Sequence, residues 1–205
     1  MSVPDRADPA TGTVDRLRSR FLDAGMRVLA RDGYGGFKQA AVCAETGLTT
    51  GGFYHAFRSW KDFEAALIAH WEVESTARVV DQLRGIHGAE ARARALLRAA
   101  VDLPHATERA LRVWSAKAPA VAAAVAEIDA TRRAAIAEFT ADLFDDADHA
   151  ADWAAQSMMM LIGYQCSTDI SPDTFARVLT RLLDDILAAP RRSPDSGGAV
   201  AQMSQ

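Results

Sequence analysis

The stretch FKQAAVCAETGLTTGGFYHAF, residues Phe37–Phe57, decides the fold class. Apolar residues at helical spacing predict two short helices in it, over residues 38–46 and 49–56. Gly47 lies between them and suits a left-handed C-terminal cap, and Thr49 suits the N-cap of the second helix. Helices this short are unstable alone in water and need a packed partner. The pattern predicts a helix-turn-helix, although a helix connection inside an ordinary bundle would look the same.

Helical spacing continues on both sides of this stretch. A first helix is predicted over residues 14–31, and it ends at the glycine-rich turn of residues 32–36. Ser59 followed by Asp62 predicts the capped start of a long helix, which the segment 85–88 ends or kinks. Within the helix-turn-helix, the predicted core anchors are Val42, Leu48 and Phe53.

The second half of the chain contains further helices and no strand pattern. They are predicted over residues 89–103, 107–117, 119–143, 148–168 and 172–188, with Asp148 as a cap and Ser171-Pro172-Asp173 as a start signal. The sequence therefore predicts an all-α protein of about nine helices. The expected division is a flexible arm (1–13), a helix-turn-helix domain (14–60), a second helical domain (61–189) and a disordered tail (190–205).

Composition excludes several classes of protein. The chain has 205 residues, a net charge of −4 and 49% hydrophobic residues, which is an ordinary globular composition. The first 71 residues hold 9 Lys or Arg and 8 Asp or Glu, so charge alone does not predict a polyanion partner. No apolar stretch is long enough to span a membrane, and the first 13 residues lack a signal-peptide core. With two distant cysteines and no secretory signal, we expect a cytoplasmic protein.

The second short helix has the side chains that a DNA-reading helix needs. Thr49, Thr50 and Gly52 lie where small groups let a helix enter the major groove. Tyr54 and His55, at its far end, can reach phosphate oxygens. If Thr50 and Tyr54 were buried inside the monomer, this interpretation would fail.

Over residues 16–71 the sequence resembles the TetR/AcrR family of transcriptional regulators. Three segments carry the resemblance: Asp32-Gly33-Tyr34, AVCAETGLTTGGFYHAF (41–57) and FRSWKDFEAAL (57–67). The resemblance implies a homodimer that binds a palindromic double-stranded DNA operator, usually as a repressor. It also implies a C-terminal domain that binds a small apolar or amphipathic effector.

Three departures from the family pattern change the expected DNA contacts. Lys38-Gln39-Ala40 replaces the usual Thr/Ser-Val-Arg, Gly52 replaces a common hydroxyl residue, and Trp60 replaces a phosphate-binding Lys. Lys61 is then the substitute phosphate contact. The DNA-contacting residues implied by the pattern and the resemblance are Lys38, Gln39, Thr49, Thr50, Gly52, Tyr54, His55 and Lys61.

The last two predicted helices, 148–168 and 172–188, are apolar on more than one face and must be buried on more than one side. A second subunit would provide that burial, and these two helices resemble the pair that forms the dimer in the TetR/AcrR family. The alternative is a monomer with a thick core. The candidate effector-binding residues are His105, Trp114, Phe139, Met158, Met159, Leu161, Tyr164 and Gln165. Each of the apolar ones also fits a plain core position.

Other chemistry has little support in the sequence. The residues Asp142, Asp145, Asp146, Asp148, His149 and Asp152 are metal-ligand types, but acidic residues at a helix start also complement its dipole, and we predict no metal site. No nucleophile, metalloprotease, P-loop or dinucleotide motif occurs, so we predict neither enzymatic activity nor a cofactor. An enzyme assembled from distant helices and a helical adaptor are the competing interpretations.

Overall fold

The computed structural model describes residues 9–188, without the side chains of residues 9–12, and every regular element in that range is helical. The elements are α1 (Pro9–Gly36), α2 (Gln39–Thr46), α3 (Thr50–Ala56), α4 (Trp60–Glu72), the π-helical turn η1 (Val73–Ala77), α5 (Arg78–Arg84), α6 (Ala89–Val101), α7 (His105–Ser115), α8 (Pro119–Thr140), the 3₁₀ turn η2 (Ala141–Leu143), α9 (Ala147–Cys166) and α10 (Pro172–Ala188). The predicted all-α class is confirmed. The tail 190–205 and residues 1–8 of the predicted arm lie outside the described residues.

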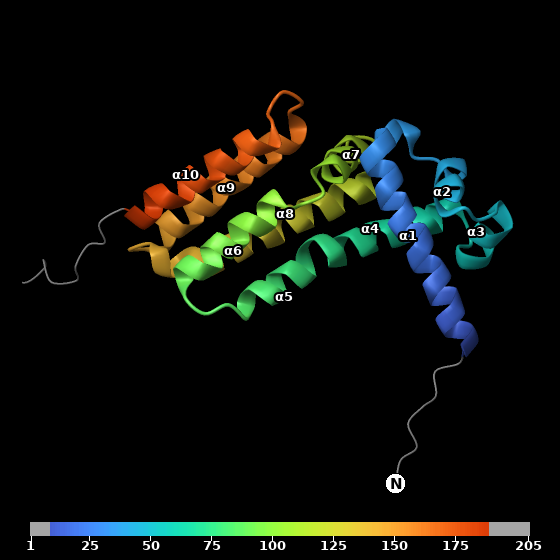
Figure 1. Ribbon diagram of the computed structural model, residues 1–205, viewed down its shortest axis with the longest axis horizontal. Helices are drawn as coiled ribbons and strands as arrows, with labels where there is room; N and C mark the ends of the chain where they lie inside the picture. Colours follow the sequence, from blue (N-terminus) through green and yellow to red (C-terminus); the bar gives the residue numbers. More distant parts are fainter. Residues whose placement is uncertain (1–8, 189–205) are drawn as a thin grey trace, which may run out of the picture.

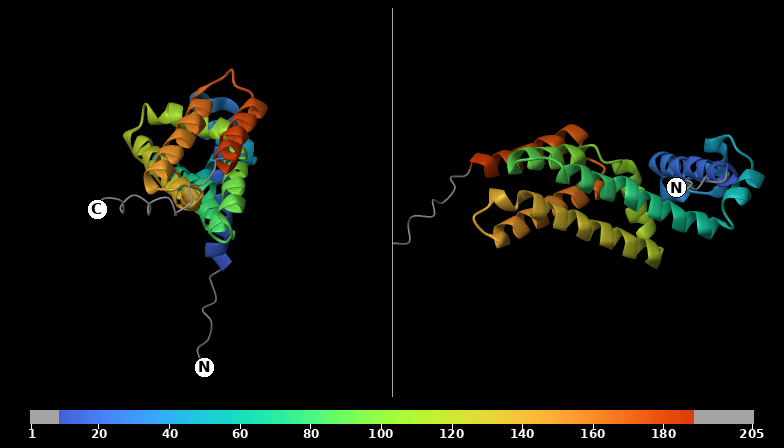
Figure 2. Two further views of the ribbon diagram at one scale, coloured as in Figure 1. Left: turned by 90° about the vertical axis from the view of Figure 1, so that its left-hand side faces the viewer. Right: turned by 90° about the horizontal axis from the view of Figure 1, so that it is seen from below.

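The helices are arranged along an elongated molecule. Figure 1 shows α1, α2 and α3 gathered at one end and the paired α9 and α10 toward the other. The α4, η1 and α5 segments follow one another without a break and run between the two ends, as the right-hand view in Figure 2 also shows. Within the described range, no helix combines the length and the apolarity that a membrane crossing requires.

Local capping fixes the helix-turn-helix as predicted. Gly47 is left-handed (φ 68°, ψ 20°), and its N–H donates to Ala44 O over 3.2 Å. The hydroxyl oxygen of Thr49 accepts from the backbone N–H of Gly52 at 3.2 Å. The predicted C-cap of α2 and N-cap of α3 are therefore confirmed.

A second cap starts α4. Ser59 Oγ accepts from the N–H of Asp62 at 3.0 Å, while Asp62 Oδ2 accepts from the N–H of Arg58 at 2.9 Å. The arrangement resembles the predicted capping box, except that Asp62 accepts from the residue before the N-cap and not from Ser59 itself. It orients α4 directly after the turn that ends α3.

Three local features differ from the sequence predictions. The first helix begins at Pro9, inside the range predicted as a flexible arm, and continues to Gly36 across a kink at Gly33 (φ 64°). The N-cap of α9 is Asp146, whose side chain accepts from the N–H of His149 at 2.8 Å, so the prediction of Asp148 was wrong. The π-helical turn η1 was not predicted, because hydrophobic spacing does not separate it from an α-helical turn.

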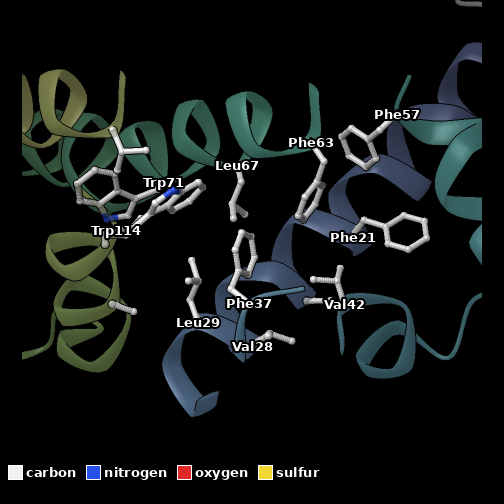
Figure 3. Packing of buried hydrophobic residues seen from close by; sticks show 14 of the residues in the cluster. Phe21, Val28, Leu29, Phe37, Val42, Phe57, Phe63, Leu67, Trp71 and Trp114 are labelled. Carbon is white, nitrogen blue, oxygen red and sulfur yellow. The ribbon is translucent and has the colours of Figure 1, made fainter. Parts of the chain in front are cut away.

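One apolar cluster, the N-terminal cluster, holds the helix-turn-helix against the rest of the chain (Figure 3). The predicted anchors Val42 and Phe53 are fully buried in it, and Leu48 packs against it half-buried. The cluster continues through α4, α7 and α8, where its members are Phe63, Leu67, Trp71, Leu111, Trp114, Val121, Val125 and Ile128. It therefore crosses the predicted domain boundary at residue 60, and α4 packs in the same cluster as the helix-turn-helix, α7 and α8.

Candidate nucleic-acid interface and ligand cavity

The outer face of α3 is open to solvent, although Thr50 contacts the thiol of Cys43 and Tyr54 contacts Gln39 of α2. Thr49, Thr50 and His55 are exposed, and Tyr54 is 55% exposed. The opposite face packs into the core through Phe53 and Ala56. A side-chain carbon added at the half-buried Gly52 would meet only Thr49 Oγ1, at 3.8 Å, so packing does not require a glycine there. The face has the shape and polarity of a groove-reading helix.

The remaining predicted DNA contacts lie at the starts of α2 and α4. Lys38, the N-cap residue of α2, is exposed, and so is Lys61 in the first turn of α4. Gln39 is half-buried, and its Oε1 lies 3.5 Å from the hydroxyl of Tyr54, which brings the start of α2 beside α3. The side-chain Nε2 of Gln39 is buried without a hydrogen-bond partner.

Trp60 has a structural role in this domain. Its ring centroid lies 4.9 Å from that of Phe37 and 5.0 Å from that of Phe63. The indole thus packs half-buried on the core of the helix-turn-helix. Lys61 is the cationic side chain that remains at the surface beside it.

Two arginines of α1 that sequence reasoning missed hold α2 and α3 in place. Arg18 Nη1 donates to the carbonyl of Ala56 over 2.5 Å, and its guanidinium lies 4.4 Å from the ring centroid of Phe57. Arg20 Nη2 donates to the carbonyl of Thr46 over 3.3 Å. Both carbonyls lie at helix C-termini, where cations are favoured. In sequence these arginines are indistinguishable from a solvated helix face.

With this geometry established, the first comparison concerns the N-terminal region. Residues 21–66 match the family model described as bacterial regulatory proteins, tetR family. This part of the chain is therefore similar to the N-terminal domain of that family. The match spans most of α1, all of α2 and α3 and the first half of α4, so the predicted helix-turn-helix DNA-binding fold is confirmed.

The fold as a whole is similar to that of solved TetR-family transcriptional regulators. A regulator of this family from Streptomyces coelicolor superposes with a TM-score of 0.67 at 20% identity, over 84% of this chain and 95% of that one. A putative one from Rhodococcus has a TM-score of 0.68 at 16% identity (84% and 100% covered). The reduced form of E. coli NemR has a TM-score of 0.68 at 17% identity (85% and 100%). A comparison with curated proteins finds no match.

A mostly apolar cavity of about 90 Å³ lies beyond the tetR-type domain. Helices α5, α6, α8, α9 and α10 and the η1 turn contribute to its walls. Most lining side chains are Leu, Ala, Val or Ile, and the polar exceptions are Ser75, Thr76, Arg132 and Ser157 together with the indole of Trp153. An outer groove of about 410 Å³ shares five lining residues with it, so the two spaces adjoin.

The structure brings two of the eight candidate effector residues to this cavity, Met158 and Leu161. Trp114 packs in the N-terminal cluster, with its ring centroid 5.5 Å from that of Tyr34. Phe139 belongs to a separate cluster with Leu83, and Met159 is 66% exposed. These three residues are apolar and helical, but the pattern could not show which neighbours they have.

The other three candidates lie beside the cavity. The ring of Tyr164 stacks on Phe175, with centroids 4.1 Å apart, and His105 meets Tyr164 edge-on at 4.7 Å. Burial lowers the pKa of His105, whose Nε2 lies 3.1 Å from the carbonyl oxygen of Val101. Gln165 is fully buried in a polar network.

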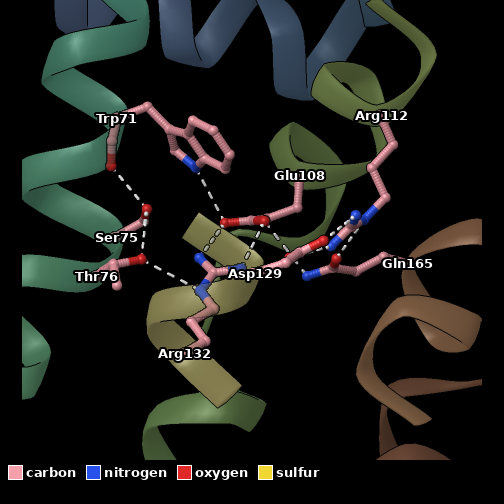
Figure 4. Close-up of polar contacts among 8 residues, drawn as sticks. All are labelled: Trp71, Ser75, Thr76, Glu108, Arg112, Asp129, Arg132 and Gln165. Atoms are coloured by element: carbon pink, nitrogen blue, oxygen red, sulfur yellow. Dashed lines mark hydrogen bonds and ion pairs between the residues drawn. The ribbon is translucent and has the colours of Figure 1, made fainter. Parts of the chain in front are cut away.

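That network centres on Glu108 of α7, which is 1% exposed (Figure 4). Its carboxylate accepts from Trp71 Nε1 at 3.0 Å and from two guanidinium nitrogens of Arg132 at 2.8 and 3.0 Å. Arg132 Nε in turn donates to Thr76 Oγ1 at 3.2 Å. The buried ion pair of Glu108 and Arg132 thus has two direct hydrogen bonds and further partners for its remaining polar atoms. Such geometry is required to offset the loss of hydration of two buried charges.

The network extends to α9. Gln165 Nε2 lies 3.5 Å from Glu108 Oε2, and Gln165 Oε1 accepts from Arg112 Nε at 2.8 Å. Arg112 also makes two bonds of 2.9 Å to Asp129. Sequence reasoning missed Glu108 and Arg132; the available signal was a charged residue of each sign at positions on the buried faces of two helices.

The acidic segment before α9 has a capping role. Asp146 caps the helix, and its Oδ2 lies 3.2 Å from Nδ1 of His149. Across the described part of the chain, no three His, Cys, Asp or Glu side chains are grouped so as to hold a metal ion.

Proposed function

We propose that this protein is a homodimeric transcriptional repressor that reads a palindromic operator with α3 and is released by a small hydrophobic effector. The observation that carries the proposal is the solvent-exposed outer face of α3, with Thr50 and Tyr54 at the surface of a tetR-type domain. The comparisons support the regulator class, since the matched structures described above are transcriptional regulators by name.

The side chains divide into two kinds of DNA contact. Thr49 and Thr50, at the start of α3, are suited to base edges in the major groove. Lys38 and Lys61 are exposed cations at the starts of α2 and α4 and are suited to phosphates, which position the helix without reading sequence. Tyr54 and His55 complete the set at the far end of α3.

The dimer would form through α9 and α10. Met159 of α9 (66% exposed) and Val178 of α10 (44% exposed) are apolar side chains left open on these helices. Pairing with the same helices of a second copy would cover them in a four-helix bundle with twofold symmetry. Two α3 helices then need a separation of about 34 Å, or a multiple of it, to enter successive major grooves on one side of DNA.

The buried network offers a route from the cavity to α4. Thr76 and Arg132 line the cavity and also belong to the network around Glu108. Trp71 links that network to the N-terminal cluster. An effector that favours a different arrangement of Arg132 would thereby favour a different position of α4, and it would shift the dimer only by its difference in affinity for the two arrangements.

The decisive experiment is a selection of genomic DNA fragments by the purified full chain, followed by gel shift on the enriched sequence. We expect a palindrome and a specific band that Thr50→Ala weakens. The matched control is Thr131→Ala, at an exposed position of α8. Absence of any enriched sequence would contradict DNA regulation, and a monomeric mass in light scattering at micromolar concentration would contradict the dimer.

A further inference from the structure

Two buried polar atoms on side chains of the cavity wall have no hydrogen-bond partner. They are Nε1 of Trp153 and Oγ of Ser157, which belong to residues that line the cavity. The two residues are four apart on α9 and therefore lie on the same helix face, one turn from each other.

The missing partner has a defined chemistry. An indole N–H only donates hydrogen bonds, so the group that satisfies Trp153 must be an acceptor. A serine hydroxyl can donate to the same oxygen or accept from a hydroxyl. Leaving a buried donor unsatisfied is costly, so a ligand that supplies an oxygen at this position gains over one that does not.

The charge of the wall limits the ligand further. Among the described residues that line the inner cavity, Arg132 alone carries an ionisable side chain. Its charge is neutralised by the two bonds to Glu108, and its Nε is bonded to Thr76. A charged ligand would therefore be buried without a counter-ion, which is strongly unfavourable.

We propose that the cavity binds a neutral, largely apolar molecule with one carbonyl or hydroxyl oxygen, held by Trp153 Nε1–H and the Ser157 hydroxyl. The volume of about 90 Å³ is below that of a cavity of about 150 Å³ that holds benzene, which indicates a small ring or short chain in the inner space. Longer parts of the molecule would extend into the adjoining groove. The regulatory meaning of this site rests on the proposed function, whereas the binding chemistry does not.

The test uses three probes built on the same five-membered ring with the full chain in the absence of DNA. Cyclopentanone supplies an acceptor, methylenecyclopentane has the same shape without one, and cyclopentanecarboxylate carries a charge. Methyl signals of ¹³C-labelled methionine report binding, since Met158 lines the cavity and the neighbouring Met159 is exposed. We expect the Met158 signal to move and the Met159 signal to stay. The ketone should bind about three- to tenfold more tightly than the alkene, and the carboxylate should leave Met158 unchanged.

Two variants assign the preference to the named atoms. Trp153→Phe keeps an aromatic ring without the donor, and Ser157→Ala removes the hydroxyl; each should bring the ketone-to-alkene ratio toward one. Trp114→Phe is the matched control, because Trp114 packs in the N-terminal cluster and should leave the ratio unchanged. Thermal unfolding shows whether each variant is folded. If Trp153→Phe does not fold, Ser157→Ala alone tests the ketone-to-alkene ratio.

The inference is overturned if ketone and alkene bind the unaltered chain equally, if the carboxylate binds more tightly, if no probe moves Met158, or if the preference survives both variants. Such a result together with intact DNA binding would leave the proposed function standing. Ketone preference in a chain that selects no DNA would instead reject the proposed function and keep the ligand assignment.

Discussion

Trp71 Nε1 donates to Glu108 Oε1 over 3.0 Å, and both side chains are 1% exposed. Trp71 belongs to the apolar cluster that holds the helix-turn-helix, whereas Glu108 holds Arg132 at the cavity wall. The hydrogen bond thus joins the two regions that a ligand-controlled DNA-binding protein has to connect.

The first prediction concerns the stability that depends on this carboxylate. Glu108→Gln leaves the charge of Arg132 buried without a partner, so we expect the free energy of unfolding to fall by about 3–5 kcal/mol. Urea denaturation measures the change. Glu138→Gln removes an exposed partner of Arg84 and should cost less than about 1 kcal/mol. Equal losses in the two variants would show that the buried ion pair contributes no more to the free energy of unfolding than the exposed one.

The second prediction concerns sequence reading. Thr50→Ala should weaken the specific DNA complex by about 1–3 kcal/mol and relax the preference at one base position in each half-site. Binding to unrelated DNA should not change, because a base contact contributes only to the specific complex. Fluorescence anisotropy on the selected operator and on a scrambled duplex measures both values. A uniform loss on both duplexes would place Thr50 on the phosphate backbone instead.

The third prediction concerns Lys61. Lys61→Ala should weaken binding to specific and scrambled DNA alike. It should also make the dependence of log affinity on log salt concentration less steep by about one, the value of one phosphate contact. The slope of log affinity against log salt concentration is the measurement. Arg133→Ala removes the same charge from an exposed position of α8 and should keep the slope. If the two variants behave alike, Lys61 makes no direct contact.

The fourth prediction concerns pH. Burial lowers the pKa of His105 from its ordinary value of 6.5, so the unfolded chain binds this proton more readily than the folded one. The neutral ring stabilises the fold above about pH 6.5, and that contribution is lost as the pH falls from there toward the lowered pKa. Denaturation between pH 7.5 and 5 should show a smaller loss of stability for His105→Phe than for the unaltered chain.

A control for this measurement is His87→Asn, which alters an exposed histidine. Its stability should follow the same pH dependence as the unaltered chain. If His105→Phe also follows it, another group causes the loss.

The fifth prediction concerns the oligomer. Val178→Glu places a charge on the open apolar face of α10 and should shift the light-scattering mass from dimer to monomer at micromolar concentration. Val113→Glu makes the same change at a 51% exposed position of α7 and should remain dimeric. A dimeric Val178→Glu variant would require a different interface.

The sequence predicted the features that depend on near neighbours. The caps at Gly47, Thr49 and Ser59 involve bonds within a few residues, and the exposed face of α3 follows from helical periodicity. The network around Glu108 could not be predicted, because its partners Trp71 and Arg132 are 37 and 24 residues away.

The cavity shows the same limit. Periodicity indicates that Trp114 and Met158 are both buried, but only the packing of whole helices decides which of them lines the cavity. The same holds for Trp153 and Ser157, whose unpartnered atoms depend on what the facing helices offer.

The continuous helical segment formed by α4, η1 and α5 contacts both members of the buried ion pair. Trp71 bonds to Glu108 and Thr76 bonds to Arg132, and the π-helical turn η1 allows both contacts. In an α-helix, residues five apart point about 140° away from each other, whereas the wider π-helical turn brings Trp71 and Thr76 back toward a common side. If this segment returned to α-helical winding, Trp71 and Thr76 would point away from each other, and one of the two hydrogen bonds to the ion pair would break.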